Sequence, residues 1–445
     1  MAAKGTTEPT RRLTAIELAG YKSAIDPVRV NFRDITILAG ANSTGKSTIM
    51  QPMLLIKQTI EKPFDPGALA IDGPLVRFTN ADQFFSHGTV NDTARKFTVA
   101  FEDGTANVKF TYGRSSASGI DLIEMSFGSD HKEYSWKNGQ LLDESQASIM
   151  EALSRTGIRK QDVAVFLRGE ELRVTRDRVL LVARFTGYSA SALDVLVGIA
   201  SPADAVVGEI RNLIYLPGLR GNPERHYVIS AGGPQYPGNF NDYVASIIHL
   251  WGTTADIRLK SLENNLKLLG LTWRVTTRAV DDTRVEVRVG RLTAPARGGA
   301  RDMVNIADVG FGVSQTLPVL VALLAAARDQ IVFVEQPELH LHPRAQVALA
   351  DILIQAADKG VRLVIETHSG LLILALQTAI AEGRITPDRV SLNWFTRDGT
   401  GQTHVAEAQI EEDGSYGDWP EDFAATDLDL QDRYMTLVEQ RHASR

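Results

Sequence analysis

The 445-residue sequence contains no cysteine. This absence excludes disulfide frameworks and thiolate metal sites, and it favours a reducing cytoplasm as the location. Long apolar runs are also missing. The longest, Leu317–Ala327, is shorter than the roughly 20 residues that span a bilayer, so we expect no membrane partner. Residues 1–12 are polar and carry no apolar core of a signal peptide.

An excess of positive charge is the third feature that the sequence lacks. The formal net charge of −7 argues against a uniformly basic nucleic-acid-binding protein but leaves local basic patches open. Lys and Arg outnumber Asp and Glu within Arg155–Arg184, which is a candidate surface for DNA or a partner protein. Because no aromatic residues interleave with these charges in a strand-binding pattern, an ordinary solvated face is the favoured interpretation.

What the sequence does contain is a phosphate-binding motif in a favourable context. The octet from Gly40 to Ser47 has two glycines five residues apart, followed by Lys and Ser. The apolar run Ile35–Ala39 predicts a buried strand before it, and Ile49–Ile56 predicts a helix after it. In such a loop the backbone N–H groups cradle polyphosphate, Lys46 reaches the terminal phosphates, and Ser47 offers its hydroxyl to Mg²⁺. The sequence therefore predicts a site for a nucleoside triphosphate.

The last third of the chain alternates apolar strands with helices. Strands are predicted at Ile331–Val334 and Arg362–Ile365, and helices at Arg344–Ala357 and Gly370–Ala381. This order predicts an α/β fold whose parallel strands present ligands at their carboxyl ends. Three units are expected: an N-terminal ATPase lobe with the P-loop at 11–146, an inserted lobe at 147–300 that is helix-like over 147–201, and a C-terminal ATPase lobe at 301–445.

Polar residues at the ends of these two strands supply the second half of the site. Glu335 is placed to hold Mg²⁺ through water. Gln336 occupies the position of the carboxylate that usually orients the attacking water, and an amide can hydrogen-bond water but cannot accept its proton. Glu338 is the nearest spare carboxylate. His368 is a candidate donor to the γ-phosphate, and a strand-end histidine bonded to backbone is the alternative.

A second anion site is expected at Gly310–Gln315, before the predicted helix Thr316–Ala327. Its glycines, its hydroxyl and a helix N-terminus suit a phosphate, with Gly312, Ser314 and Gln315 as the contacting residues. A chain with one P-loop and one such segment can close two ATP sites in a head-to-tail dimer. A plain helix cap is the alternative.

Gln83 is the remaining candidate. It lies where a residue that senses Mg²⁺ and the γ-phosphate could stand, and an exposed loop glutamine explains it equally well.

Four segments together resemble the ABC-type ATPases of the SMC/RecF/OLD class, specifically the short bacterial "AAA family" branch often found in anti-phage defence operons. They are Gly40–Thr48, Gly310–Gln315, Glu335–Pro343 and Glu366–Ser369. The segment Gly417–Phe423 also resembles that branch. The resemblance covers the ATPase core, roughly half of the chain, and no motif covers Ala147–Ser201.

The resemblance implies an ABC-type ATPase head with a mixed sheet and an inserted, mostly helical lobe, and it implies ATP and Mg²⁺ as cofactors. It assigns the signature to Ser314 and Gln315, the D-loop to Leu341 and His342, and the switch histidine to His368. The ATP-binding candidates of the P-loop are Gly40, Asn42, Ser43, Gly45, Lys46, Ser47 and Thr48.

Two functions fit this resemblance. The first is an ATP-dependent oligomeric switch, either a head-to-tail dimer or a larger assembly, that acts in anti-phage defence with a separate effector such as a nuclease. The second is a RecF-like DNA-repair clamp that binds duplex DNA when closed by ATP. Gln336 replaces the catalytic glutamate of the class, so slow hydrolysis is expected in either case.

Two further interpretations are less favoured. Glu338, His340 and His342 could be metal ligands, but the D-loop position and Pro343 explain them better. Asp427-Leu428-Asp429 resembles the acidic pair of a TOPRIM nuclease, but no apolar strand precedes it and a carboxylate-rich helix start is the favoured interpretation. We therefore expect no intrinsic nuclease.

Overall fold

The computed structural model describes residues 12–86, 95–104, 106–115, 119–129, 132–142, 171–186, 201, 203–230, 233, 235–294, 302–417 and 433–437. Its centre is a six-stranded sheet in the order β11-β16-β17-β3-β18-β19. The five strands from β11 to β18 are parallel, and β19 pairs antiparallel to β18. The bounds are β11 Ile214–Leu216, β16 Ile331–Glu335, β17 Arg362–Thr367, β3 Ile35–Gly40, β18 Val390–Arg397 and β19 Thr403–Ala408.

The strand order determines which residues can meet the P-loop. β3, which leads into the P-loop, pairs with β17 and β18. β16, which ends at Glu335, is one strand further away because β17 lies between it and β3. The nearest neighbours of the P-loop within the sheet are therefore the carboxyl end of β18 on one side and, on the side toward β16, the carboxyl end of β17. The residues there are Glu366 and Thr367, followed by His368.

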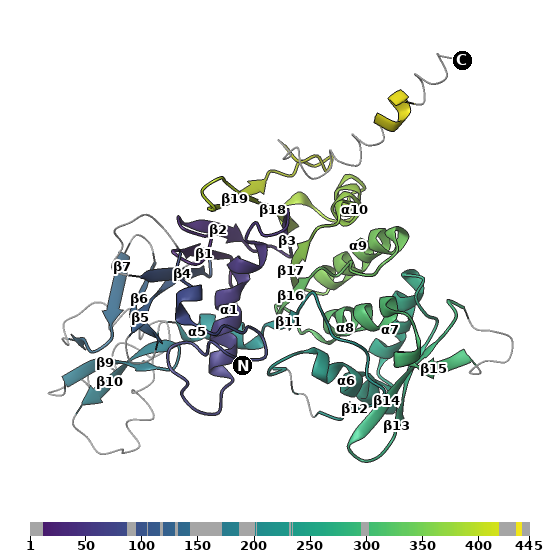
Figure 1. Cartoon of the computed structure of the whole chain (residues 1–445), viewed down its shortest axis with the longest axis horizontal. Helices are drawn as coiled ribbons and strands as arrows, with labels where there is room; N and C mark the ends of the chain where they lie inside the picture. Colours follow the sequence, from purple (N-terminus) through teal and green to yellow (C-terminus); the bar gives the residue numbers. More distant parts are fainter. Residues whose placement is uncertain are drawn as a thin grey trace, which may run out of the picture.

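Both faces of this sheet are covered, which explains why β3, β16 and β17 are largely apolar. Alternate side chains of β16, such as Phe333 and Val334, enter two separate cores. One core contains α1 (Lys46–Ile60), α5 (Asp204–Asn212) and the N-terminal sheet. The other contains helices that lie on the opposite side of the sheet (Figure 1). They are α6 Asn241–Thr253, α7 Ile257–Leu268, α8 Phe311–Ala325, α9 Pro343–Asp358 and α10 Gly370–Ala381.

Three further sheets surround this centre. The largest is antiparallel, in the order β2-β1-β4-β5-β6-β7. Its bounds are β2 Val28–Asn31, β1 Ala15–Ala19, β4 Lys96–Glu102, β5 Asn107–Ser115, β6 Gly119–Ser129 and β7 Lys132–Lys137. The other two contain β8 Leu141–Leu142, β9 Glu171–Asp177 and β10 Leu180–Thr186, and β12 Tyr227–Val228, β13 Val275–Ala279, β14 Arg284–Gly290 and β15 Met303–Asn305. Short 3₁₀ turns are η1 Ala81–Gln83, η3 Ile306–Asp308 and η4 Pro387–Arg389.

The α/β fold with a mixed sheet is as predicted, but the inserted lobe differs from expectation in its described parts. Residues 171–186 form a β-hairpin rather than helix, and Val174 is buried between more exposed neighbours. β11 lies in the central sheet, and α6 and α7 cover it, although all three fall within 147–300. Most of 147–201 lies outside the described residues.

No helix within the described ranges is both long enough and apolar enough to cross a bilayer. The TOPRIM-like segment Asp427-Leu428-Asp429 and nearly all of Gly417–Phe423 lie outside those ranges.

Candidate functional site

The P-loop has a backbone that requires its glycines. Gly40 and Gly45 adopt φ values of 146° and 100°. A Cβ at Gly40 would stand 2.3 Å from the carbonyl oxygen of Phe395, and one at Gly45 would stand 2.5 Å from Thr403 Oγ1. These spaces are closed by β18 and β19, so the neighbouring hairpin as well as the loop's own curvature excludes a side chain.

Lys46 and Ser47 open α1 directly after this loop, where the N-terminus of a helix favours an anion. Lys46 Nζ donates to the carbonyl oxygens of Gly40 at 3.1 Å and Ala41 at 2.7 Å, which holds the ammonium at the centre of the loop. Burial lowers the pKa of Lys46, and the nearby carboxylate of Glu366 opposes that shift.

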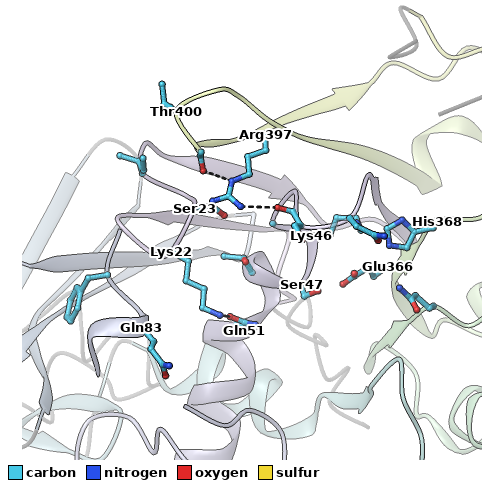
Figure 2. Close-up of a pocket in the computed structure, with 18 residues that line it drawn as sticks. Lys22, Ser23, Lys46, Ser47, Gln51, Gln83, Glu366, His368, Arg397 and Thr400 are labelled. Atoms are coloured by element: carbon cyan, nitrogen blue, oxygen red, sulfur yellow. Dashed lines mark hydrogen bonds between the residues drawn. The ribbon is translucent and has the colours of Figure 1, made fainter. Parts of the chain in front are cut away.

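A cavity of about 610 Å³ opens above these residues (Figure 2). The predicted residues that line it are Asn42, Ser43, Gly45, Lys46, Ser47, Thr48, Gln83, Gln336 and His368. It has room for more than a triphosphate, and its walls also include three residues that motif reasoning missed, Lys22, Glu366 and Arg397.

The β18–β19 hairpin packs against the P-loop and donates hydrogen bonds to its backbone carbonyls. Thr403 Oγ1 lies 2.8 Å from the carbonyl oxygen of Thr44, and Arg397 Nη1 donates to the carbonyl of Ser43 at 3.4 Å. Lys22 reaches the cavity from the β1–β2 side and donates to Gln51 Oε1 at 2.6 Å. Burial lowers the pKa of Lys22 to about 8. No local motif identifies these residues, because they meet the loop only through sheet pairing.

Glu335 ends β16 with both carboxylate oxygens engaged. Oε1 accepts from Tyr215 Oη at 2.9 Å, and Oε2 accepts from the Gly218 N–H at 3.0 Å. Glu335 does not line the P-loop cavity.

Gln336 turns toward the cavity in a left-handed backbone conformation with φ 45°, which is uncommon outside glycine. Its N–H donates to the carbonyl oxygen of Glu366 at 2.7 Å. Gln336 is thus among the residues that line the P-loop cavity, and its contact with the attacking water stays a prediction.

Glu338 and His368 are connected to each other. Glu338 Oε1 accepts from Thr367 Oγ1 at 2.7 Å and from the His368 N–H at 3.0 Å. The His368 side chain reaches the cavity and the backbone of Gly40. Burial and the charge of Lys46 lower the pKa of His368, so its imidazole is neutral near pH 7 and can still donate one hydrogen bond.

Glu366 is the carboxylate that faces the P-loop most directly. Its side chain and that of Ser47 point toward each other in Figure 2. Burial first, and then the charge of Glu335, raises the pKa of Glu366 to about 7, while Ser47 and Lys46 favour its ionised form. This carboxylate could have been noticed from the sequence, because Glu366 lies in the segment Glu366–Ser369, of which sequence analysis used only the histidine.

The signature segment lies away from the P-loop cavity of its own chain. α8 begins at Phe311, five residues earlier than predicted, so Gly312, Ser314 and Gln315 lie inside its first turns. The helix can start there because Gly310 takes the extended N-cap conformation. Ser314 Oγ donates to the Phe311 carbonyl at 3.2 Å. None of the three predicted signature residues lines the P-loop cavity.

Arg220 joins this helix to the end of β16. Its Nη2 donates to the carbonyl oxygens of Glu335 at 2.6 Å and Gln336 at 3.3 Å, and its Nη1 donates to that of Gln315 at 3.2 Å. The backbone N–H of Arg220 donates to Gln315 Oε1, whose amide nitrogen in turn donates to the Gly221 carbonyl at 2.6 Å. Sequence analysis gave Arg220 no role.

Gln83 has a local structural function. Its Oε1 accepts from the N–H groups of Thr79 at 3.0 Å and Asn80 at 3.4 Å, completing a capping box around η1. Its side chain still borders the cavity, on the side of Lys22 (Figure 2).

The oxygen atoms at the cavity suit Mg²⁺, which prefers oxygen ligands and retains several of its waters. The Ser47 hydroxyl and the Glu366 carboxylate are such oxygens, and Glu366 Oε2 is buried with no hydrogen-bond partner in the described structure. The alternative site of Glu338, His340 and His342 is not assembled: both histidines are exposed while Glu338 is buried. Across the described ranges, no cluster of three or more His, Asp or Glu residues is arranged to hold a metal.

Comparisons with known proteins agree with a P-loop ATPase. The family described as "AAA domain, putative AbiEii toxin, Type IV TA system" matches residues 296–375, which include the signature, the end of β16 and His368. No curated protein matches the sequence significantly.

Solved structures of SMC heads are similar in outline. The SMC head domain from Thermotoga maritima is 10% identical with a TM-score of 0.36, covering 90% of this chain and 99% of that one. An Smc head with an extended coiled coil, bound to the C-terminal domain of ScpA derived from Pyrococcus furiosus, is 10% identical with a TM-score of 0.43, covering 97% and 99%. An SmcHead bound to the C-winged helix domain of ScpA is 12% identical with a TM-score of 0.42, covering 90% and 98%. Likeness at this level carries no argument about activity, which is argued below from the site.

Proposed function

We propose that this chain binds ATP with Mg²⁺ at the P-loop, hydrolyses it slowly, and acts as a nucleotide-dependent oligomeric switch. The observation that carries the proposal is the single cavity shared by Lys46, Ser47, Gln336 and His368. Lys46 and the α1 N-terminus suit the phosphates, and Ser47 suits the hydrated metal ion. Bound Mg²⁺ would neutralise the charge that develops on the transferred phosphoryl group.

Slow turnover follows from the residue that faces the attacking water. Gln336 borders the cavity, and its amide orients water without accepting a proton. The neutral imidazole of His368 supplies a donor to the γ-phosphate. The site therefore binds and positions its substrate better than it activates the nucleophile, which suits a clamp held closed by ATP.

Self-association is supported by the position of α8. Its N-terminus lies outside the P-loop cavity of the same chain, and Phe311 there is 52% exposed. Leu219, next to Arg220, is 83% exposed. Exposed apolar side chains beside a free helix N-terminus suit contact with the triphosphate face of a second copy. We extend the proposal to anti-phage defence with a separate effector chain, on the resemblance of the motifs.

The first prediction tests nucleotide binding itself. Lys46→Ala removes a charged hydrogen-bond donor to the phosphates, and we expect ATP affinity to fall roughly 10- to 100-fold. Isothermal titration calorimetry with a non-hydrolysable ATP analogue measures this. Lys359→Ala, at an exposed position after α9, is the matched control and should bind as the wild type does. Undiminished affinity in Lys46→Ala would contradict the proposal.

A further inference from the structure

The P-loop cavity has two ends that carry different side chains. Glu366 and His368 line one end, and Lys46 lies at the centre. Arg397 and Thr400 line the other end, on the far side of Lys46 (Figure 2). The proposed function puts the γ-phosphate at the first end. Because a nucleoside triphosphate carries its base at the opposite end from the γ-phosphate, the nucleoside points toward the second end.

The β18–β19 hairpin holds Arg397 at this second end in a fixed orientation. Its Nε donates to the Gly401 carbonyl at 2.8 Å, and its Nη1 donates to the Ser43 carbonyl of the P-loop at 3.4 Å. Both bonds lie in the plane of the guanidinium, because its N–H groups do. Gly401 has φ 90°, and a Cβ there would stand 3.3 Å from Arg397 Nη2. The plane of the guanidinium is therefore fixed, and its face stays available to another flat group.

The charge of Arg397 has no counterion in the described part of the chain. The adjacent carboxylate of Asp398 is used inside the hairpin tip, where its Oδ1 accepts from the N–H groups of Thr400 at 2.9 Å and Gln402 at 3.0 Å. The other oxygen, Oδ2, lies 2.9 Å from His404 Nε2. The tip is thus held by its own bonds, and the guanidinium remains open to a ligand.

The other cation at this side of the cavity suits a base less well. Lys22 Nζ donates to Gln51 Oε1 at 2.6 Å and lies 4.4 Å from the centre of the Phe78 ring. An ammonium is a point charge that suits a phosphate, whereas a planar guanidinium also stacks on aromatic rings. Arg397 is therefore the better partner for a base.

We propose that the β18–β19 hairpin is the nucleoside wall of this site, with the base of the bound nucleotide stacked on the face of Arg397. Arg397 thereby distinguishes a nucleoside triphosphate from bare polyphosphate. Every base has a π face, so this contact favours nucleotides without selecting one base. The inference rests on the proposed nucleotide binding at the P-loop.

Isothermal titration calorimetry with a non-hydrolysable ATP analogue and with inorganic tripolyphosphate, each with Mg²⁺, tests the inference. The wild type should bind the nucleotide more tightly. Arg397→Ala should weaken nucleotide binding about 3- to 30-fold, the range of a cation–π contact, and should weaken tripolyphosphate binding several-fold less. Arg397→Lys keeps the charge but lacks the flat group, so tripolyphosphate binding should be unchanged while part of the nucleotide affinity is still lost.

Arg384→Ala is the matched control. Arg384 is an exposed arginine after α10 that forms ion pairs with Asp351 and Glu382, and its variant should bind both ligands as the wild type does.

Equal losses for the two ligands in Arg397→Ala would assign this side chain to the phosphates or to the P-loop backbone and would overturn the inference. Unchanged nucleotide binding in Arg397→Ala, full nucleotide affinity in Arg397→Lys, or equal affinity of the wild type for the two ligands would also overturn it. Failure of the wild type to bind either ligand would instead overturn the proposed function on which the inference rests.

Discussion

Gln336 combines two features at the scale of a single residue. It lines the P-loop cavity, where we propose that it contacts the attacking water, and its φ of 45° is a conformation that few side chains adopt without support. The support comes from three hydrogen bonds to its backbone: its N–H donates to the Glu366 carbonyl, and its carbonyl accepts from the Leu339 N–H and from the Arg220 side chain. The turn therefore aims the amide at the cavity regardless of the identity of the side chain, and a glutamate should occupy the same place.

This leads to a prediction about turnover. Gln336→Glu supplies the missing proton acceptor, and positioned general bases contribute about 10²- to 10⁴-fold to rates. We expect steady-state phosphate release to rise at least about tenfold, the remainder being lost to imperfect positioning. Gln409→Glu, at an exposed position after β19, controls for added charge and should leave the rate unchanged. An unchanged rate in Gln336→Glu would show that proton abstraction does not limit hydrolysis.

Glu366 makes stability depend on pH. Its ordinary pKa of 4.5 is raised to about 7, chiefly by burial. Between these values the native state holds a proton that the unfolded chain has released, so the free energy of unfolding falls as the pH rises through this window. Glu366→Gln removes the effect. In EDTA, we expect this variant to be more stable than the wild type at pH 8 by on the order of 1 to 3 kcal/mol, with the advantage much reduced at pH 5.

Urea unfolding at the two pH values measures this difference. The exposed Glu411→Gln serves as the control and should show no such pH-dependent gain. A Glu366→Gln variant that is less stable than the wild type at pH 8 would mean that the carboxylate is satisfied in the native protein without metal.

At the scale of elements, Arg220 connects α8 to β16. Its side chain is 8% exposed, and burial lowers its pKa to about 10, so it stays charged at neutral pH while donating to carbonyls of both elements. Arg220 therefore links the first turns of α8 to the backbone of Gln336.

Removing this connection should be costly. Arg220→Ala leaves buried carbonyls unpaired, and we expect a loss of about 3 kcal/mol in the free energy of unfolding. Arg225 lies on the same loop and makes an exposed ion pair with Asp308, so Arg225→Ala should cost less than about 1 kcal/mol. Denaturant titrations of the two variants compare these values directly. Equal losses would show that Arg220 does not bridge the two elements.

The sequence predicted the elements well where the pattern was local. Ile35–Ala39, Ile331–Val334 and Arg362–Ile365 are continuous apolar runs because both faces of the sheet are covered, and such runs are visible without a structure. The start of α8 was misplaced because glycine and serine resemble a loop, yet Gly310 provides an N-cap that lets the helix begin at Phe311.

The site was predictable only in part, because some of its residues meet through the order of the strands and not through a local pattern. Spacing alone identifies the P-loop, but the contacts of Arg220, Glu366 and Arg397 depend on strand order. Because β17 lies between β3 and β16, Glu366 is on the strand next to the P-loop strand, and no local pattern encodes that order. The β9–β10 hairpin was missed because its alternation is short and interrupted by charges.

At the scale of the whole molecule, the central sheet separates two cores, and each carries one half of the proposed ATP site. The α1 side carries the P-loop, and the α8 side carries the signature segment (Figure 1). Within one chain these halves do not share a cavity. A second copy can bring them together, and the account therefore depends on ATP-driven association.

Sedimentation velocity with and without Mg²⁺-ATP tests this central claim most directly. The wild type should associate only with nucleotide, and Lys46→Ala and Phe311→Asp should remain unassociated. Aspartate suits a helix N-terminus, so Phe311→Asp should fold while repelling the phosphates of the other copy. Ile257→Asp, with the same kind of change at a 79% exposed site on α7, should associate normally. An association state that is the same with and without ATP would contradict the account.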